Sequence, residues 1–184
     1  MAGKGMPAAL LMSSLQARVQ VLFDDPTNLA ALVTRLNRII SSNCPSNRFI
    51  TFFIGVLEPK TGELTYVNAG HNPPLVAHAD GSVEKLEGTG LILGILPMAT
   101  YQQGVCHLGP GDAVLLFSDG VTEAVRPDAD EEFGEERLAQ VLAGLRDQSA
   151  ESIITSINQK VEDFTAGAPP ADDITLVVAK RLAN

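Results

Sequence analysis

The sequence predicts an α+β fold, because helical and strand patterns occupy separate stretches of the 184-residue chain. Apolar residues recur at helical spacing near both ends. Between these regions lie short apolar runs bounded by glycine, proline and aspartate, which indicate strands joined by turns. Strands grouped between pairs of helices fit an α+β fold, and we expect the middle of the chain to form an antiparallel meander.

Two helices are expected before the first strand. The first runs from Pro7 to Leu22 and has apolar residues at helical spacing. Asp25 followed by Pro26 predicts the N-cap and the first position of a second helix. That helix has a wide apolar stripe of six residues: Leu29, Leu32, Val33, Leu36, Ile39 and Ile40. Residues 43–47 are expected to end it.

Strand patterns fill the middle of the chain. The apolar runs cover residues 49–57, 64–67, 75–78, 82–86, 101–108 and 113–117. Turn-forming segments separate the members of three successive pairs, at residues 59–62, 79–81 and 109–112. We expect the first two pairs to be hairpins, and the run at 113–117 to be a strand buried on both faces.

Helices and one more strand are expected in the last third of the chain. Helical spacing resumes at Leu138 and again after Ser149, which is predicted to cap a helix that reaches Phe164. Two prolines at 169–170 then break the chain before a β-branched run at 174–179, which predicts an interior strand.

Two aspartates stand at the ends of predicted buried strands. Asp119 follows the run at 113–117, and Asp172 precedes the run at 174–179. If these strands are antiparallel neighbours, both carboxylates emerge at the same edge of the sheet, where oxygen ligands suit Mg²⁺ or Mn²⁺. The alternative is that each aspartate only forms a turn, since Asp-Gly and Asp-Asp after proline are common turn chemistry.

Four motifs occur in order along the chain, at residues 3–10, 68–74, 118–124 and 171–175. Together they make the chain resemble the metal-dependent protein phosphatases, in particular the bacterial SpoIIE-like branch that acts on serine-phosphorylated regulators of sigma factors. The resemblance covers nearly all of residues 1–184 and implies a single catalytic domain. It also implies two antiparallel sheets stacked face to face, with a helix pair packed outside each.

The resemblance implies a phosphoserine/phosphothreonine protein phosphatase that uses two Mn²⁺ or Mg²⁺ ions. A water that bridges the metals would attack the phosphomonoester, so no side chain is needed as a nucleophile. Asp119 and Asp172 match metal ligands of the family, Asp173 matches a neighbour that is not usually a ligand, and Met1 matches a position whose backbone carbonyl helps to hold a metal. The implied partners are a phosphorylated protein and an upstream sensor or receiver domain.

The start of the chain departs from the family pattern. The family places a metal-bridging aspartate two residues before the position of Ala2, and this chain begins at Met1. We therefore expect a fragment that lacks the first strands of its domain and is weakly active or inactive by itself. The alternative is a phosphatase-like fold kept as a binding or scaffold module. Because missing strands leave an unpaired edge, we expect a homodimer or an exchange of segments between copies.

Composition and charge exclude several classes of protein. A net charge of −9 without a cluster of lysine and arginine argues against binding to nucleic acid or to an anionic membrane surface. No apolar stretch approaches the roughly 20 residues that span a bilayer, and the N-terminus lacks the layout of a signal peptide. Cys44 and Cys106 lie far apart and lack metal-ligand spacing. The expected compartment is the cytoplasm.

His71 and residues 126–134 each have a functional and a structural interpretation, and residues 3–5 have a structural one. His71 could act as a general acid, or it could brace the turn between two strands by hydrogen bonds. In the resembling family the region equivalent to residues 126–134 couples partner contacts to metal binding, whereas a solvated loop is the simpler interpretation. Residues 3–5 lack the pattern of a phosphate-binding loop and are expected to let the backbone turn into the first helix.

Overall fold

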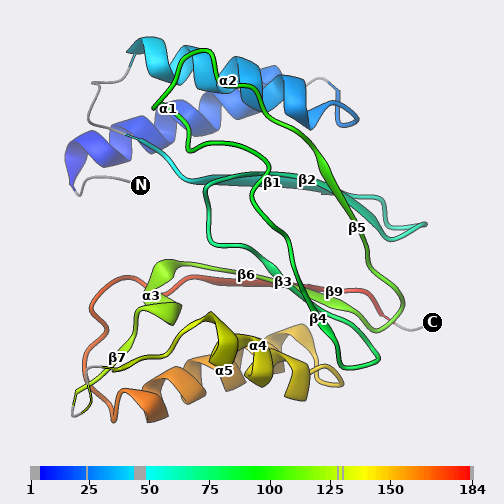
Figure 1. Ribbon diagram of the computed structural model, residues 1–184, viewed down its shortest axis with the longest axis vertical. Helices are drawn as coiled ribbons and strands as arrows, with labels where there is room; N and C mark the ends of the chain where they lie inside the picture. The colour runs from blue at the N-terminus through cyan, green and yellow to red at the C-terminus, as the bar shows by residue number, and fades with distance from the viewer. Residues whose placement is uncertain (1–4, 24, 44–48, 128, 130, 183–184) are drawn as a thin grey trace. The chain divides into compact units, whose positions relative to one another are not determined.

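The computed structural model describes residues 5–23, 25–43, 49–127, 129 and 131–182, and it divides into two units (Figure 1). The first unit comprises Met1–His71 and Glu87–His107, and the second comprises Asn72–Leu86 and Leu108–Asn184. Each unit contains an antiparallel sheet and a pair of long helices. The predicted α+β fold is therefore confirmed.

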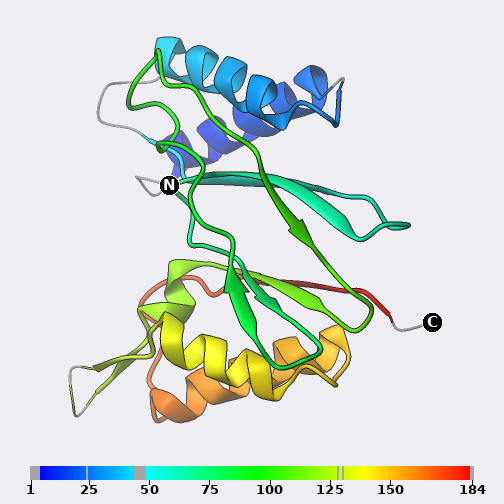
Figure 2. The same cartoon turned by 45° about the vertical axis from the view of Figure 1, so that its right-hand side comes forward.

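In the first unit, two helices cover one face of a three-stranded sheet with the order β1-β2-β5 (Figure 2). The elements are α1 (Met6–Leu22), α2 (Leu29–Asn43), β1 (Phe52–Leu57), β2 (Glu63–Ala69) and β5 (Gly104–His107). β1 and β2 form the predicted hairpin, with Gly62 at a φ of 82° in its turn. Five of the six residues of the predicted apolar stripe of α2, all but Ile39, pack into a core with β1 and β2, and Leu29, Val33, Leu36 and Ile40 are fully buried.

The start of α2 differs from the prediction. Asn28, rather than Asp25, caps the helix, because the backbone N–H of Ala31 donates to Asn28 Oδ1 at 3.0 Å. The Asp25 carboxylate instead accepts hydrogen bonds from the backbone N–H and the hydroxyl of Thr27, at 2.9 and 2.6 Å. Since this local turn occupies the Asp25 side chain, the helix begins after the next residue that can cap it.

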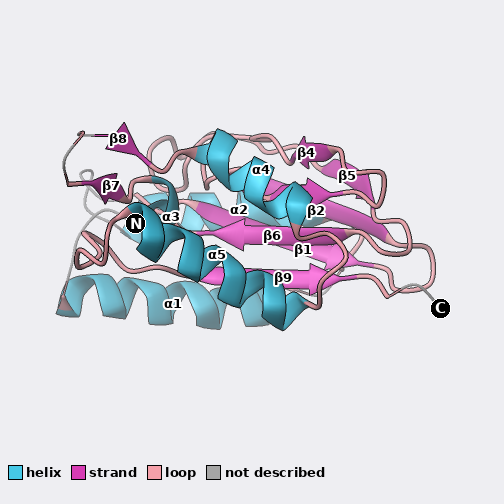
Figure 3. Cartoon of the chain, turned by 90° about the horizontal axis from the view of Figure 1, so that it is seen from below, coloured by secondary structure: helices cyan, strands magenta, loops and turns pink. Residues whose placement is uncertain are grey.

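In the second unit, helices α4 and α5 lie across one face of a four-stranded sheet with the order β4-β3-β6-β9 (Figure 3). The elements are β3 (Leu75–Ala77), β4 (Val83–Lys85), β6 (Ala113–Phe117), α3 (Asp119–Thr122), β7 (Val125–Arg126), β8 (Glu131–Glu132), α4 (Glu135–Gly144), α5 (Ala150–Phe164) and β9 (Leu176–Lys180). Ser149 caps α5 as predicted, since its Oγ accepts the N–H of Ser152 at 3.1 Å. The core includes Leu115, Phe117, Leu138 and Ile157.

Two predictions about strand placement were wrong. The strands do not form one meander, because β5 returns to pair with β2 while the β3–β4 hairpin joins the sheet of β6. β9 was expected to be interior, yet within the described part of the chain it is an edge strand, and Val177 is 52% exposed. A β-branched run indicates a strand but does not determine which neighbours it pairs with.

Two exclusions drawn from composition can be compared with the structure. Along the described residues, no helix has the length and apolar character needed to cross a membrane. Cys106 is buried. Cys44 lies outside the described residues.

Candidate metal site at one end of strands β6 and β9

The strands beside the two aspartates are antiparallel neighbours, as the metal-site hypothesis requires. Phe117, the last residue of β6, pairs with Leu176, the first residue of β9. The contact continues by one more residue, because the backbone N–H of Ser118 donates to the carbonyl of Thr175 at 3.0 Å. Asp119 follows this point along the chain and Asp172 precedes it, so both leave the sheet at the same end.

The side chain of Ser118 ties these two segments together. Its Oγ accepts the backbone N–H of Thr175 at 2.8 Å and donates to the carbonyl of Asp173 at 2.9 Å. These bonds fix the backbone just before Asp119 against the backbone just after Asp172. This role of Ser118 was not predicted from the sequence, where its only signal is its place next to Asp119.

Gly120 brings the same two segments into direct contact. A Cβ atom at this position would lie 2.6 Å from the carbonyl oxygen of Asp173 and 3.0 Å from that of Asp172. Because backbone atoms cannot yield to a contact that short, only glycine lets α3 begin this close to the loop before β9. The sequence suggested turn chemistry for Asp-Gly, so the steric need for Gly120 was missed.

Both carboxylates are on the surface. Asp119 is the first residue of α3 and is exposed, and its Oδ1 accepts the N–H of Gly120 at 3.0 Å. Asp172 is also exposed, and its Oδ1 accepts the N–H of Asp173 at 2.9 Å. Each carboxylate therefore accepts a hydrogen bond from the backbone N–H of the next residue with one oxygen, and each aspartate is exposed to solvent.

The carboxylates of Asp119 and Asp172 are suitable ligands for a hard divalent cation. Carboxylate oxygens are ligands that Mg²⁺ and Mn²⁺ prefer. The two carboxylates lie on backbone segments that Ser118 and Gly120 hold side by side. Within the described part of the chain, no cluster of three or more histidine, cysteine, aspartate or glutamate side chains is arranged to hold a metal. Water, substrate or groups outside that part would have to complete the ion's coordination.

The other predicted positions belong to the first unit. Met1 and residues 3–4 lie outside the described residues. Gly5 has a φ of 83°, and its carbonyl accepts the N–H groups of Ala8 and Ala9 at 3.1 Å each, which confirms its predicted role at the entry to α1. The backbone N–H of His71 donates to Oδ1 of the buried Asn68 at 2.9 Å. This bond braces the turn, which is one of the two interpretations of His71; a catalytic role for its imidazole stays the untested alternative.

The base of the acidic segment at residues 126–134 is a short hairpin and not a plain loop. Val125 pairs with Glu132 and Arg126 pairs with Glu131, whereas residues 128 and 130 lie outside the described residues. Arg137 from α4 holds the hairpin, because its guanidinium donates to Glu131 Oε1 at 2.6 Å and to the carbonyl of Glu132 at 3.0 Å. Arg137 therefore joins the described base of the hairpin to α4.

A second cluster of ionisable groups occupies the opposite end of β6. Asp112 precedes the strand and is buried, and its carboxylate accepts hydrogen bonds from the N–H of Ala79 at 2.8 Å and the N–H of Gly109 at 2.9 Å. Its Oδ2 also lies 2.8 Å from Nδ1 of His78, whose Nε2 is 3.4 Å from Glu84. Burial raises the pKa of Asp112, but these hydrogen bonds outweigh it and the pKa is lowered. This cluster was also missed, since neither Asp112 nor His78 belongs to a recognisable motif.

The chain matches known proteins along almost its whole length. The family described as Stage II sporulation protein E (SpoIIE) matches residues 1–182. Phosphoserine phosphatase RsbU of Bacillus subtilis (strain 168) is 33% identical over 190 residues, which cover 97% of this chain and 53% of RsbU. The chain thus spans about half the length of this relative.

Solved structures have the same fold. The SiaA-PP2C domain of Pseudomonas aeruginosa superposes with a TM-score of 0.82 and 21% identity, over 99% of this chain and 73% of that chain. The phosphatase domain of the cell fate determinant SpoIIE from Bacillus subtilis, presoaked with Mn, gives a TM-score of 0.63 and 17% identity, over 100% of this chain and 76% of that chain. Since the family match covers all but the last two residues, the chain belongs to the SpoIIE family.

Proposed function

We propose that this chain is the catalytic domain of a metal-dependent phosphatase that removes phosphate from phosphoserine or phosphothreonine in a protein. The observation that carries the proposal is the antiparallel pairing that brings Asp119 and Asp172 to one end of β6 and β9. Membership of the SpoIIE family supports the reaction, because the relative RsbU is named a phosphoserine phosphatase. The activity, substrates and partners of the whole protein are part of the proposal.

The proposed cofactor is Mn²⁺ or Mg²⁺, with two ions at the site. Presoaking of the related SpoIIE phosphatase domain with Mn supports this choice. A cation held at the site would supply Lewis-acid chemistry for transfer of the phosphoryl group to water. Asp119 and Asp172 would hold the cation, while Ser118 and Gly120 keep the backbones of the two aspartates together. The cation would also attract the phosphate, which a chain with a net charge of −9 repels.

The proposed substrate is a phosphorylated regulator in a sigma-factor pathway, and a sensor or receiver domain is the proposed controlling partner. RsbU supports this arrangement because it extends well beyond the region that matches this chain. We propose the cytoplasm as the compartment.

Hydrolysis of a phosphoserine peptide by the full-length gene product tests the function, with Mn²⁺ and with EDTA. We expect release of phosphate that requires Mn²⁺ and is lost in Asp119→Asn and in Asp172→Asn. Asp173→Asn is the matched control, because Asp173 is an exposed neighbour whose carbonyl, not its carboxylate, contacts Ser118. A rate that EDTA leaves unchanged would contradict the proposal. Mn²⁺ binding without hydrolysis of any phosphopeptide would favour the scaffold alternative.

A further inference from the structure

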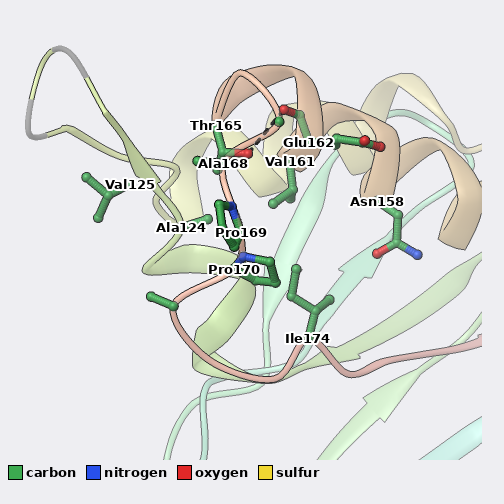
Figure 4. A pocket seen from close by; sticks show the side chains of 12 residues that line it. Ala124, Val125, Asn158, Val161, Glu162, Thr165, Ala168, Pro169, Pro170 and Ile174 are labelled. Atoms are coloured by element: carbon green, nitrogen blue, oxygen red, sulfur yellow. Dashed lines mark hydrogen bonds between the residues drawn. The ribbon is translucent and has the colours of Figure 1, made fainter.

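A largely apolar pocket of about 400 Å³ lies in the second unit, between the C-terminal half of α5 and the loop that leads to β9 (Figure 4). Its apolar lining consists of Ala124, Val125, Val161, Pro169, Pro170 and Ile174, among others. Figure 4 shows the side chains of Val161 and Ile174 pointing toward the two prolines. The volume falls within the range of about 300–1,000 Å³ that is usual for pockets that bind ligands.

Two chain segments that line the pocket, besides α5, lie next to the proposed metal site along the chain. Ala171 and Ile174 stand on either side of Asp172 and Asp173 in the loop before β9. In the second segment, Ala124 and Val125 come shortly after α3, which begins at Asp119. The hydrogen bond from Ser118 to Asp173 and the close contact of Gly120 hold these two chain segments together. Two of the segments that line the pocket are thus the segments that carry the two aspartates.

The polar groups around the pocket indicate what it would bind. Among the described residues that line it, Glu162 alone is charged, and it is exposed. The hydroxyl of Thr165 donates to the carbonyl of Glu162 at 3.1 Å and so has its hydrogen bond within the protein. The inner wall thus favours an apolar group, because burying a polar group without a partner is costly. The carboxylate of Glu162 favours a cation at the rim.

We propose that this pocket docks the phosphoprotein substrate by taking up one apolar side chain close to the phosphorylated serine, with a lysine or arginine beside it facing Glu162. The proposal rests on the proposed phosphatase function and adds to it a sequence preference of the substrate. It accounts for the chain segments that the pocket and the two aspartates have in common, with the phosphate at Asp119 and Asp172 and an apolar side chain a few residues away in the pocket.

A series of phosphoserine peptides tests this proposal, with the full-length gene product and Mn²⁺. A single leucine is moved through the positions on both sides of the phosphoserine, and the remaining positions hold alanine or serine. At one or two positions we expect leucine to raise kcat/KM about tenfold over alanine, as for burial of one apolar side chain in a specificity pocket. A lysine next to that leucine should raise kcat/KM further, and Glu162→Gln should remove this second gain.

Variants that fill the pocket separate docking from general effects on the enzyme. Asn158→Trp projects from α5 and Ala168→Phe projects from the loop, so each fills the pocket from a different wall. Either variant should reduce the preference for leucine to less than about twofold. Gln159→Trp is the matched control, since Gln159 is the next residue on α5 and does not line the pocket. Circular dichroism shows which variants are folded, and either filled variant is sufficient for the comparison.

The possible outcomes distinguish the docking proposal from the proposed function. Hydrolysis without a preference for leucine at any position overturns the docking proposal and leaves the phosphatase function standing. A preference for leucine that survives both Asn158→Trp and Ala168→Phe also overturns it. If no peptide of the series is hydrolysed, the phosphatase function itself is wrong.

Discussion

The two ends of strand β6 each carry an aspartate, and the surroundings of these residues are opposite. Asp112, before the strand, is only 5% exposed, and its carboxylate accepts hydrogen bonds from two backbone N–H groups and approaches the ring of His78. Asp119, after the strand, is exposed, and its Oδ1 accepts the N–H of the next residue. The same type of side chain therefore stabilises the sheet at one end and is accessible to a ligand at the other.

The largest expected effect is on activity at the Asp119 end. In the full-length gene product, Asp119→Asn removes a charged oxygen ligand, so we expect the Mn²⁺-dependent kcat/KM on a phosphoserine peptide to fall by about three orders of magnitude. The free energy of unfolding should change by less than about 0.5 kcal/mol, because Asp119 is exposed. Enzyme assays and urea titrations of the same preparation check both values. Activity within threefold of the wild type would show that Asp119 holds no essential metal.

At the Asp112 end, we expect the main effect to be on stability. Asn at this position can accept with only one of its two side-chain atoms, so Asp112→Asn leaves a buried N–H of Ala79 or Gly109 without its acceptor. We expect the free energy of unfolding to fall by about 2 kcal/mol in urea titrations. Asp147→Asn, at an exposed aspartate, is the control. If Asp112→Asn were as stable as the wild type, the two ends of β6 would not differ as described.

Gly120 tests whether the backbone contact beside Asp119 is required. Gly120→Ala places a Cβ against the carbonyl oxygens of Asp172 and Asp173, at 3.0 and 2.6 Å if nothing moves. We expect thermal or urea unfolding to show a loss of about 1–3 kcal/mol. Gly144→Ala, at a helical glycine whose added Cβ would meet no atom within 4 Å, should be neutral or stabilising. Equal stability of the two variants would mean that α3 and the loop before β9 separate easily.

The smallest expected effect is a pH dependence of stability at the Asp112 end. The hydrogen bond to Asp112 is the main reason that the pKa of His78 is raised from 6.5, while partial burial opposes it and Glu84 adds to it. Because the folded-state pKa exceeds the unfolded one, this stabilisation is complete below pH 6.5 and is lost as the pH rises through the folded-state pKa. We expect the loss to be less than about 1 kcal/mol.

Urea titrations across this pH range measure the effect, and His78→Gln should remove it. His107→Gln, at an exposed histidine, is the control and should keep the pH dependence of the wild type. An unchanged pH dependence in His78→Gln would assign it to another group.

The sequence predicted the positions of the helices and strands better than it predicted which strands pair. Helical spacing located α2 and α5, and the apolar run at 113–117 located β6, because burial imposes a period on each element. It did not predict that β5 pairs with β2 or that β9 forms an edge, because strand pairing depends on contacts between residues far apart in the chain.

The candidate site was predictable only where a residue type has its own chemistry. Asp119 and Asp172 are recognisable as possible ligands because carboxylates at strand ends can bind cations. Ser118 and Gly120 act on the backbone of a segment more than 50 residues away, which no local pattern reveals. The N-cap of α2 was wrong for a related reason, since both Asp25 and Asn28 can cap and the choice depends on the turn that Thr27 makes with Asp25.

Binding of Mn²⁺ measured by calorimetry tests most directly whether Asp119 and Asp172 form a metal site. The wild type, Asp119→Asn, Asp172→Asn and Asp112→Asn are compared under the same conditions. We expect the affinity for Mn²⁺ to fall at least about tenfold in each of the first two variants, as for loss of a metal contact, and to be unchanged in Asp112→Asn. Wild-type affinity for Mn²⁺ in either Asp119→Asn or Asp172→Asn would contradict the assignment.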